Sequence, residues 1–232
     1  GLNLVSFEDH SKFQPTFFLE YCPNGNLREI LEKESQGLSR AEWTPTKKYI
    51  ILLGISHAMK YLHKLGIIHR DLKTSNILID NDFYPNFGLS RKFGFSLTKD
   101  NLLTMTTNVG TPLYMAPELI IGEEKYGSGV DVYAFAIMAY EITTSLNPYN
   151  ETKDEGTKIL MQLLKDQNGR PLFPENFNPK MKELISSCWH RYDRPSFGEI
   201  FDALANDFSF SDEDIDEEEV RNYIEILNES EK

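Results

Sequence analysis

The stretch HRDLKTSNILIDNDFYPNFGLSR, residues 69–91, places an acid, a lysine and an amide close together. Asp71 and Lys73 lie two residues apart, so an extended loop would direct both side chains to the same side. Asn76 follows three residues later. Together these groups can accept a proton from a hydroxyl, neutralise a phosphate and hold a metal ion through an amide oxygen. That combination suits phosphoryl transfer.

The composition is that of a soluble globular protein. The chain has 232 residues, of which 40% are hydrophobic and 26% charged, enough for one domain or at most two. The formal net charge is −12, and residues 209–232, with ten acidic and two basic residues, carry −8 of it. The remaining −4 on residues 1–208 does not indicate a basic surface for nucleic acid. The acidic tail is either a solvated terminus or a binding segment for a basic partner.

No feature of the sequence indicates a membrane or a secretory route. Cys22 and Cys188 lie far apart and lack metal-ligand spacing, which is typical of reduced thiols in a cytoplasmic protein. No apolar run approaches the ~18 residues that a membrane span needs, and the N-terminus lacks a signal-peptide pattern. We therefore expect a cytoplasmic protein. The chain begins with Gly1 rather than Met, so it was processed or is a piece of something longer.

The hydrophobic pattern predicts an α+β fold that is mainly α-helical. Thr44 followed by Pro45 predicts the start of a long amphipathic helix that runs to His63. Residues 130–142 are apolar around nearly the full circumference of a helix and should lie at the centre of a helical domain. Further helices are predicted at 27–34, 152–166, 179–187 and 196–206, and a loosely attached one at 217–227. Short strands are predicted at 3–7, 16–21 and 77–79, and a long irregular segment at 86–118.

Several motifs resemble those of the protein kinase family, over about residues 4–208. HRDLKTSN resembles the catalytic loop, and NFG at 86–88 stands where the family has Asp-Phe-Gly. The other matching motifs are FLEYCPNGNL (18–27), GTPLYMAPE (110–118), DVYAFA (131–136) and CWHRYDRPSF (188–197). The last two are closest in style to the tyrosine kinase-like branch. Lys73 together with Thr111 indicates serine/threonine rather than tyrosine substrates.

The resemblance implies a domain organisation. Residues 1–208 would form a truncated protein kinase domain, with the last N-lobe strands at 1–21 and the C-lobe at 22–208. Residues 209–232 would be the acidic C-terminal tail. The cofactors would be ATP and Mg²⁺, and the partner a protein substrate or another protein, with no nucleic acid and no membrane. The oligomeric state is not indicated.

The resemblance also implies roles for the catalytic residues. Asp71 would accept the proton of the substrate hydroxyl, and Lys73 would stabilise the transferring phosphoryl group. Asn76 would bind the second Mg²⁺. Arg70 would hold a phosphate on the activation loop, a role that requires a phosphorylated residue in that loop. The candidates are Thr104, Thr106 and Thr107, which are otherwise ordinary polar residues of a loop.

Other matching positions would bind adenine or support the fold. Glu20 and Cys22 would offer backbone groups to adenine, Leu78 would pack beneath the ring, and Leu19 would be the gatekeeper. Three structural roles follow from the same resemblance. Glu118 and Arg194 would form a buried ion pair, Asp131 would accept backbone N–H groups of the catalytic loop, and His69 would pack against Phe87.

Two departures from the family pattern bear on activity. Asn86 replaces the metal-binding aspartate with an amide of nearly the same shape but no charge. No glycine-rich loop or strand lysine precedes the hinge. We therefore expect binding of Mg·ATP to be weak or absent in this chain. Three hypotheses remain: a serine/threonine kinase whose N-lobe lies upstream, a pseudokinase or scaffold that binds protein partners, and a truncated relic.

Overall fold

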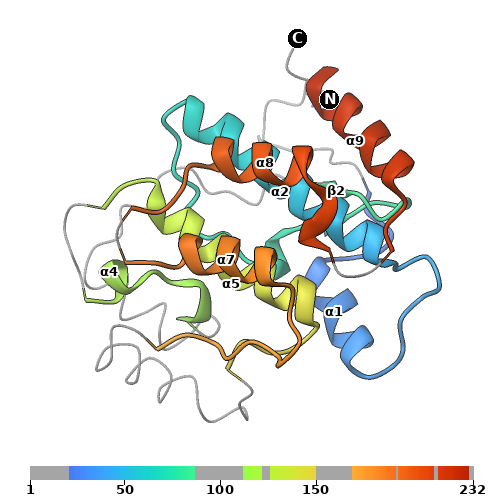
Figure 1. Ribbon diagram of the computed structural model, residues 1–232, viewed down its shortest axis with the longest axis horizontal. Coiled ribbons are helices and arrows are strands. Elements are labelled where there is room, and N and C mark those ends of the chain that lie inside the picture. The colour runs from blue at the N-terminus through green and yellow to red at the C-terminus, as the bar shows by residue number, and fades with distance from the viewer. Residues whose placement is uncertain are drawn as a thin grey trace, which may run out of the picture.

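Helix α5 (Gly129–Thr144) runs through the centre of the structure, as its apolar sequence predicts. This computed structural model describes residues 21–86, 112–121, 126–149, 169–191, 193–211 and 214–229. Within α5, all side chains from residue 130 to 140 are buried, as is Ile142. Helices α2 (Pro45–Lys64) and α7 (Pro179–Cys188) pack against α5, which lies in the middle of the fold in Figure 1. Because a helix that is apolar on every side has to be enclosed by protein, α5 forms the axis of the core.

The remaining described elements are helices, short 3₁₀ turns and two strands. The helices are α1 (Leu27–Ser35), α2 (Pro45–Lys64), α4 (Pro117–Ile120), α7 (Pro179–Cys188), α8 (Phe197–Asn206) and α9 (Glu217–Glu229). The 3₁₀ turns are η1 (Thr74–Asn76), η2 (Pro112–Tyr114) and η3 (Phe208–Phe210). Six predicted helices, including α5 and the tail helix α9, are confirmed to within two residues at each end. The predicted helix at 152–166 lies outside the described residues.

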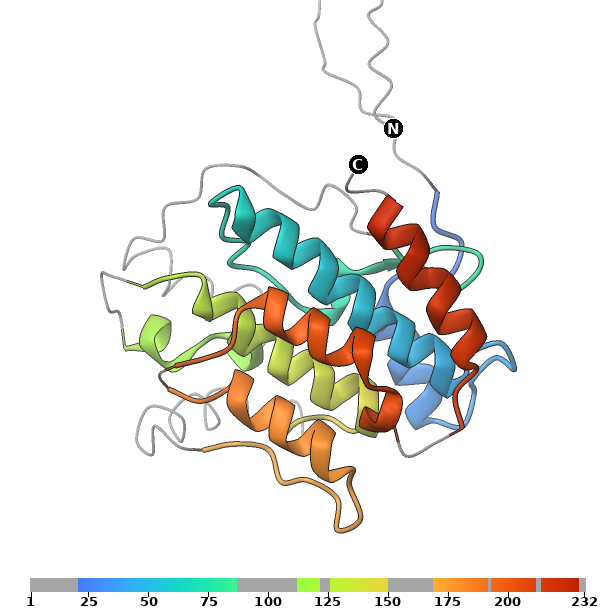
Figure 2. The same cartoon turned by 45° about the horizontal axis from the view of Figure 1, so that its top comes forward.

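Helix α2 connects the core to the C-terminal helices. The Thr44 hydroxyl accepts a hydrogen bond from the backbone N–H of Lys47 at 3.3 Å, and Pro45 occupies the first turn. These two features define the start of α2, as the sequence predicts. Both α8 and α9 pack against α2 (Figure 2). Helix α2 is therefore covered on more than one side, which explains its long run of buried residues.

The sheet of the described residues is a small antiparallel hairpin, β1 (Leu78–Ile79) and β2 (Pro85–Asn86). Its register places Leu78 opposite Asn86 and Ile79 opposite Pro85. An isolated bridge joins Asn26 to Leu78 on the other side. The third predicted strand is therefore confirmed at Leu78–Ile79. The strands predicted at 3–7 and 16–21 lie outside the described residues except for Tyr21, which has no regular structure.

The sequence predicts an irregular segment at residues 86–118, but part of it forms short helices. Within residues 86–118, the turn η2 and the start of α4 lie in the described part. Pro117 stands in the first turn of α4, and the backbone N–H of Leu119 donates to the Ala116 carbonyl at 2.9 Å. Helices this short leave little periodicity in a sequence, which is why the pattern did not reveal them.

The prediction of a loosely attached tail helix is wrong. Helix α9 packs against α2, and its residues Val220 and Tyr223 are 0% and 6% exposed. Ile224 and Leu227 are partly buried against the same core. These four residues have the i, i+3, i+4, i+7 spacing of one helix face. The high acidity of the segment concealed this apolar stripe.

No helix in the described ranges is long and apolar enough to cross a membrane.

Candidate active site

The HRDLKTSN loop, residues 69–76, is anchored to the core by Asp131. This α5 residue is 1% exposed, and its two carboxylate oxygens accept the backbone N–H groups of His69 and Arg70, each at 2.8 Å. The Nε2 atom of His63 lies 2.9 Å from the same carboxylate. Arg70 has a φ of 66°, a left-handed conformation that is unfavourable for a side chain of its size. The two hydrogen bonds from a buried carboxylate offset that strain.

The carboxylate of Asp71 is held from both sides by residues of its own loop. Its Oδ1 lies 3.0 Å from Nζ of Lys73, and its Oδ2 accepts a hydrogen bond from Nδ2 of Asn76 at 2.8 Å. Nδ2 of Asn76 also donates to the Asp71 backbone carbonyl at 2.6 Å. The Asp71 side chain is 40% exposed. An oriented carboxylate that remains open to solvent can accept a proton from an incoming hydroxyl.

The oxygen donors available to a divalent cation are weaker than Mg²⁺ prefers. Asn76 uses its amide nitrogen toward Asp71, so its amide oxygen is the group suited to a cation. Asn86 lies in β2 and pairs with Leu78 of β1. Leu78 comes two residues after Asn76 in the sequence. The described residues contain no group of three or more His, Cys, Asp or Glu that could hold a metal ion. The Asn76 amide beside the Asp71 carboxylate fits at most a weakly bound cation.

The positions expected to contact adenine are only partly described. Cys22 is partly exposed and its carbonyl accepts the Gly25 N–H at 3.2 Å, which forms a tight turn. Leu78 is partly buried between its partners Asn26 and Asn86. The turn and the hairpin are therefore adjacent, with the Ile79 N–H donating to the Gly25 carbonyl at 2.9 Å. Leu19, Glu20, Phe87, Thr104, Thr106, Thr107 and Thr111 lie outside the described residues.

A chain of hydrogen bonds links the HRDLKTSN loop to α5 through residues that the sequence reasoning missed. Thr74 is 1% exposed, and its hydroxyl lies 2.9 Å from that of Tyr114. Tyr114 donates to Oε2 of Glu141 at 2.5 Å. Burial raises the pKa of the Glu141 carboxyl to about 7 and that of Tyr114 well above its usual value. The signal in the sequence that could have revealed this relay is Glu141, an acidic residue within a largely apolar helix.

An ion pair joins the segment after the HRDLKTSN loop to the C-terminal helices. Arg194 donates to both carboxylate oxygens of Glu118, at 2.5 and 3.0 Å. The Arg194 guanidinium also donates to the carbonyls of Gly129 and His190, at 2.9 and 2.6 Å. Its side chain is 5% exposed and that of Glu118 is 15% exposed. The pair is thus nearly enclosed, with its charges neutralised by close partners.

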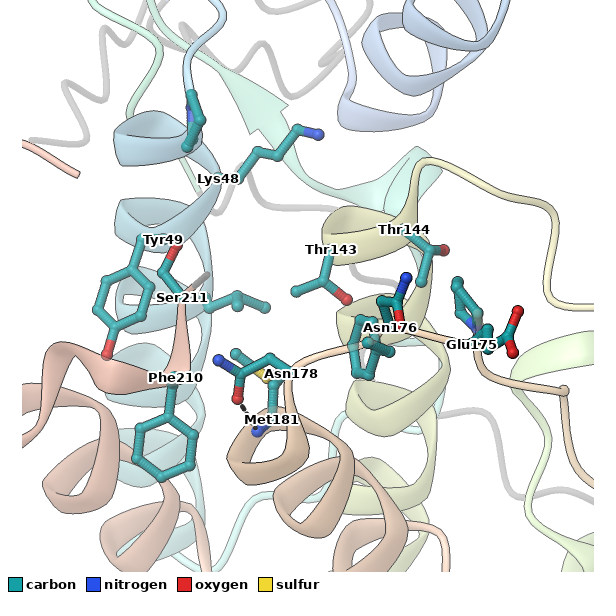
Figure 3. Close-up of a pocket in the computed structure, with 14 residues that line it drawn as sticks. Lys48, Tyr49, Thr143, Thr144, Glu175, Asn176, Asn178, Met181, Phe210 and Ser211 are labelled. Atoms are coloured by element: carbon teal, nitrogen blue, oxygen red, sulfur yellow. Dashed lines mark hydrogen bonds between the residues drawn. The ribbon is translucent and has the colours of Figure 1, made fainter. Parts of the chain in front are cut away.

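A cavity of about 410 Å³ lies away from this loop, between α2, α5 and α7 (Figure 3). Several polar groups in its wall already have partners. The hydroxyls of Thr143 and Thr144 donate to α5 carbonyls at 2.6 and 2.7 Å, and Asn178 accepts the Met181 N–H at 2.9 Å. Lys48 donates to the Ser145 hydroxyl at 2.9 Å. Because these polar groups bond to the protein itself, they stabilise the wall of the cavity. We therefore place the candidate site at the HRDLKTSN loop.

The sequence pattern of the protein kinase domain matches residues 3–206, and the chain belongs to the protein kinase family. It is 35% identical over 212 residues, 89% of its length, to a probable serine/threonine-protein kinase of Dictyostelium discoideum. It is 37% identical over 187 residues, 80% of its length, to a probable LIM domain-containing serine/threonine-protein kinase of the same organism. It is 33% identical over 187 residues, 78% of its length, to the dual specificity protein kinase shkB, also from Dictyostelium discoideum. The chain spans 15%, 27% and 27% of the lengths of these three relatives.

Proposed function

We propose that this chain carries the catalytic loop of a serine/threonine protein kinase of the tyrosine kinase-like branch, in which phosphoryl transfer is strongly impaired at residue 86. The observation that carries the proposal is the Asp71 carboxylate held between Lys73 and Asn76. The relatives named above support the serine/threonine assignment, since two of them are serine/threonine-protein kinases by name. The substrate would be a hydroxyl of another protein.

The proposed roles are those that the resemblance to the family implies, and the contacts of the loop support those of Asp71 and Lys73. Asp71 accepts the proton of the substrate hydroxyl, and the Lys73 ammonium at 3.0 Å keeps its carboxylate oriented. Lys73 is also near enough to Asp71 to stabilise negative charge on the transferring group. Arg70 is proposed to bind a phosphate group on the activation segment, and the phosphorylated residue would be Thr104, Thr106 or Thr107. Thr111 is proposed to position the substrate.

Asn86 limits the reaction because it is neutral. Asn76 and Asn86 would hold Mg²⁺, and backbone groups of Glu20 and Cys22 would hold the adenine of ATP. When bound, Mg²⁺ would offset the negative charge of the phosphates. An amide at residue 86 removes a carboxylate from that arrangement, a loss of about 3–4 kcal/mol, or several hundredfold in rate. We therefore propose weak binding of Mg·ATP.

The proposed kinase part covers residues 1–208, divided at residues 21 and 22 into the last N-lobe strands and the C-lobe. Residues 209–232 follow as a C-terminal extension.

The second candidate function is a scaffold that binds protein partners. It is favoured because residue 86 lacks the charge of a metal ligand, whereas the contacts that anchor the HRDLKTSN loop and the Glu118–Arg194 ion pair are intact. The Asp131 carboxylate accepts hydrogen bonds from two loop amides at 2.8 Å, and Glu118 and Arg194 form a nearly enclosed ion pair. A chain that keeps its folding contacts but has a neutral metal ligand can still present a surface to a partner.

Ligand binding by the purified chain tests the proposal. We expect no rise in melting temperature at millimolar Mg·ATP. We expect Asn86→Asp to bind Mn²⁺ at least about tenfold more tightly than the unaltered chain, as measured by loss of the free Mn²⁺ signal in electron paramagnetic resonance. Asn76→Ala added to Asn86→Asp should cancel the gain. A clear thermal shift with Mg·ATP in the unaltered chain would refute impairment at residue 86.

A further inference from the structure

Helix α9 contacts Tyr84, the residue that precedes the strand carrying Asn86. Its first turn is fixed on α2, because the Asp216 N–H donates to the Thr46 hydroxyl at 2.9 Å. Next, Glu219 accepts a hydrogen bond from Lys47 of α2 at 2.5 Å. The two side chains are 14% and 30% exposed, so solvent only partly screens this pair. The helix therefore lies in a defined position on α2 before it reaches the hairpin (Figure 2).

The second contact is between α9 and Tyr84, the residue before β2. The rings of Tyr84 and Tyr223 lie 4.9 Å apart between centroids, and the Lys47 ammonium lies 4.4 Å from the Tyr84 ring centroid. The Tyr84 hydroxyl is 3.5 Å from Glu219. Aromatic and cation–π contacts of this kind each contribute on their own, beyond the apolar area that they bury. Tyr84 thus contacts both α2 and α9 and is partly buried against them.

The third contact is the closest approach among α2, α9 and β2, at Gly54. A Cβ atom on Gly54 would lie 2.4 Å from Cγ of Pro85 and 2.5 Å from the hydroxyl oxygen of Tyr223. Only a residue without a side chain fits between these groups. Pro85 pairs with Ile79 on its other side, so α2, α9 and β1 together fix the residue that precedes Asn86.

The α9 side of these contacts lies beyond the part of the chain that matches the kinase family, whereas the α2 and hairpin side lies within it. The match ends at residue 206, whereas α9 covers Glu217–Glu229. The segment thus adds a helix to the family's domain, and its buried face meets the hairpin at residues 84 and 85. The exposed face of α9 carries the acidic residues, which take no part in these contacts apart from Glu219.

We propose that α9 is a brace that positions the β1–β2 hairpin, with Tyr223 as the positioning residue through which the C-terminal helix controls the placement of Asn86. The significance of residue 86 as a cation ligand rests on the proposed function. The order of the hairpin does not depend on the proposed function. The contact between α9 and the hairpin can therefore be detected even in a chain that transfers no phosphate. The two ideas therefore fail separately.

Backbone order in the folded chain, measured by ¹⁵N NMR relaxation, tests the brace without any ligand. In the unaltered chain we expect order parameters near ~0.85 at Tyr84 and Asn86. In Tyr223→Ala they should fall below ~0.6, while the amides of α7 and α8 keep their values. Tyr223→Phe retains the ring and should restore the order. Ile226→Ala is the matched control, because Ile226 lies on the same helix but is 56% exposed.

Two outcomes would overturn the proposal. One is unchanged order at Tyr84 and Asn86 in Tyr223→Ala. The other is a loss of order spread evenly over α7 and α8, which would make Tyr223 a general packing residue. If Tyr223→Ala does not fold, Tyr223→Leu retains apolar bulk but not the aromatic contact, and the same amides decide the question.

Discussion

Tyr114 donates a hydrogen bond to Glu141 at 2.5 Å, and its oxygen lies 2.9 Å from the Thr74 hydroxyl. Since the single hydroxyl proton of Tyr114 goes to Glu141, Thr74 is the donor in the other contact. The relay ties the HRDLKTSN loop to the central helix α5 through the segment at 112–114. Glu141 therefore holds the loop through Tyr114 and Thr74, while Asp131 holds it directly through the His69 and Arg70 amides.

The stability of the protein should depend on the protonation of Glu141. Burial raises its pKa from 4.5 to about 7, with Tyr114 and Arg28 opposing the shift and Glu32 adding to it. The folded state therefore binds the proton more tightly than the unfolded state. This contribution is complete below about pH 4.5 and is lost as the pH rises through about 7, a change of up to about 3 kcal/mol.

Glu141→Gln tests this dependence, because the amide is uncharged at every pH and still accepts from Tyr114. Urea denaturation at pH 5 and pH 8 should show a variant that gains stability relative to the unaltered chain as the pH rises. Glu183→Gln on the exposed face of α7 is the control and should not reproduce the trend. Parallel pH profiles for Glu141→Gln and the unaltered chain would contradict the assignment.

Loss of one partner of the Glu118–Arg194 ion pair should destabilise the fold strongly. Arg194→Met leaves the carboxylate of Glu118, 15% exposed, without its bidentate partner. We expect a cost of about 3–5 kcal/mol in the free energy of unfolding, measured by urea denaturation. The double variant with Glu118→Gln should recover much of it. Glu217→Gln breaks the exposed pair with Arg221 and should change stability little.

Gly54→Ala should destabilise the protein, although alanine favours a helix over glycine by about 0.5–1 kcal/mol. The added methyl group would overlap Pro85 and Tyr223, at a cost of about 1–3 kcal/mol. Gly198→Ala on α8 is the matched control, since its nearest neighbour would be the Ser196 oxygen at an ordinary 3.6 Å. Equal effects of the two substitutions on the melting temperature would argue against close packing at Gly54.

The longer of the described helices could be predicted because their signals are local. Thr44 with Pro45 defines the start of α2, and the apolar run of α5 places that helix in the core. The packing of α9 against α2 could not be predicted, because it depends on a narrow apolar face of a helix whose sequence is mostly acidic. The relay from Thr74 to Glu141 joins residues far apart in sequence, and no local pattern encodes such a contact.

Phosphotransfer tests the central claim most directly, in a version of the chain that carries a complete N-terminal lobe. Initial rates with ATP, Mg²⁺ and a serine- or threonine-containing peptide should rise by about 10²- to 10³-fold on Asn86→Asp, since a carboxylate restores the charge that the cation requires. Asp71→Asn added to that variant should remove the activity. Equal rates with asparagine and aspartate at residue 86 would contradict the account.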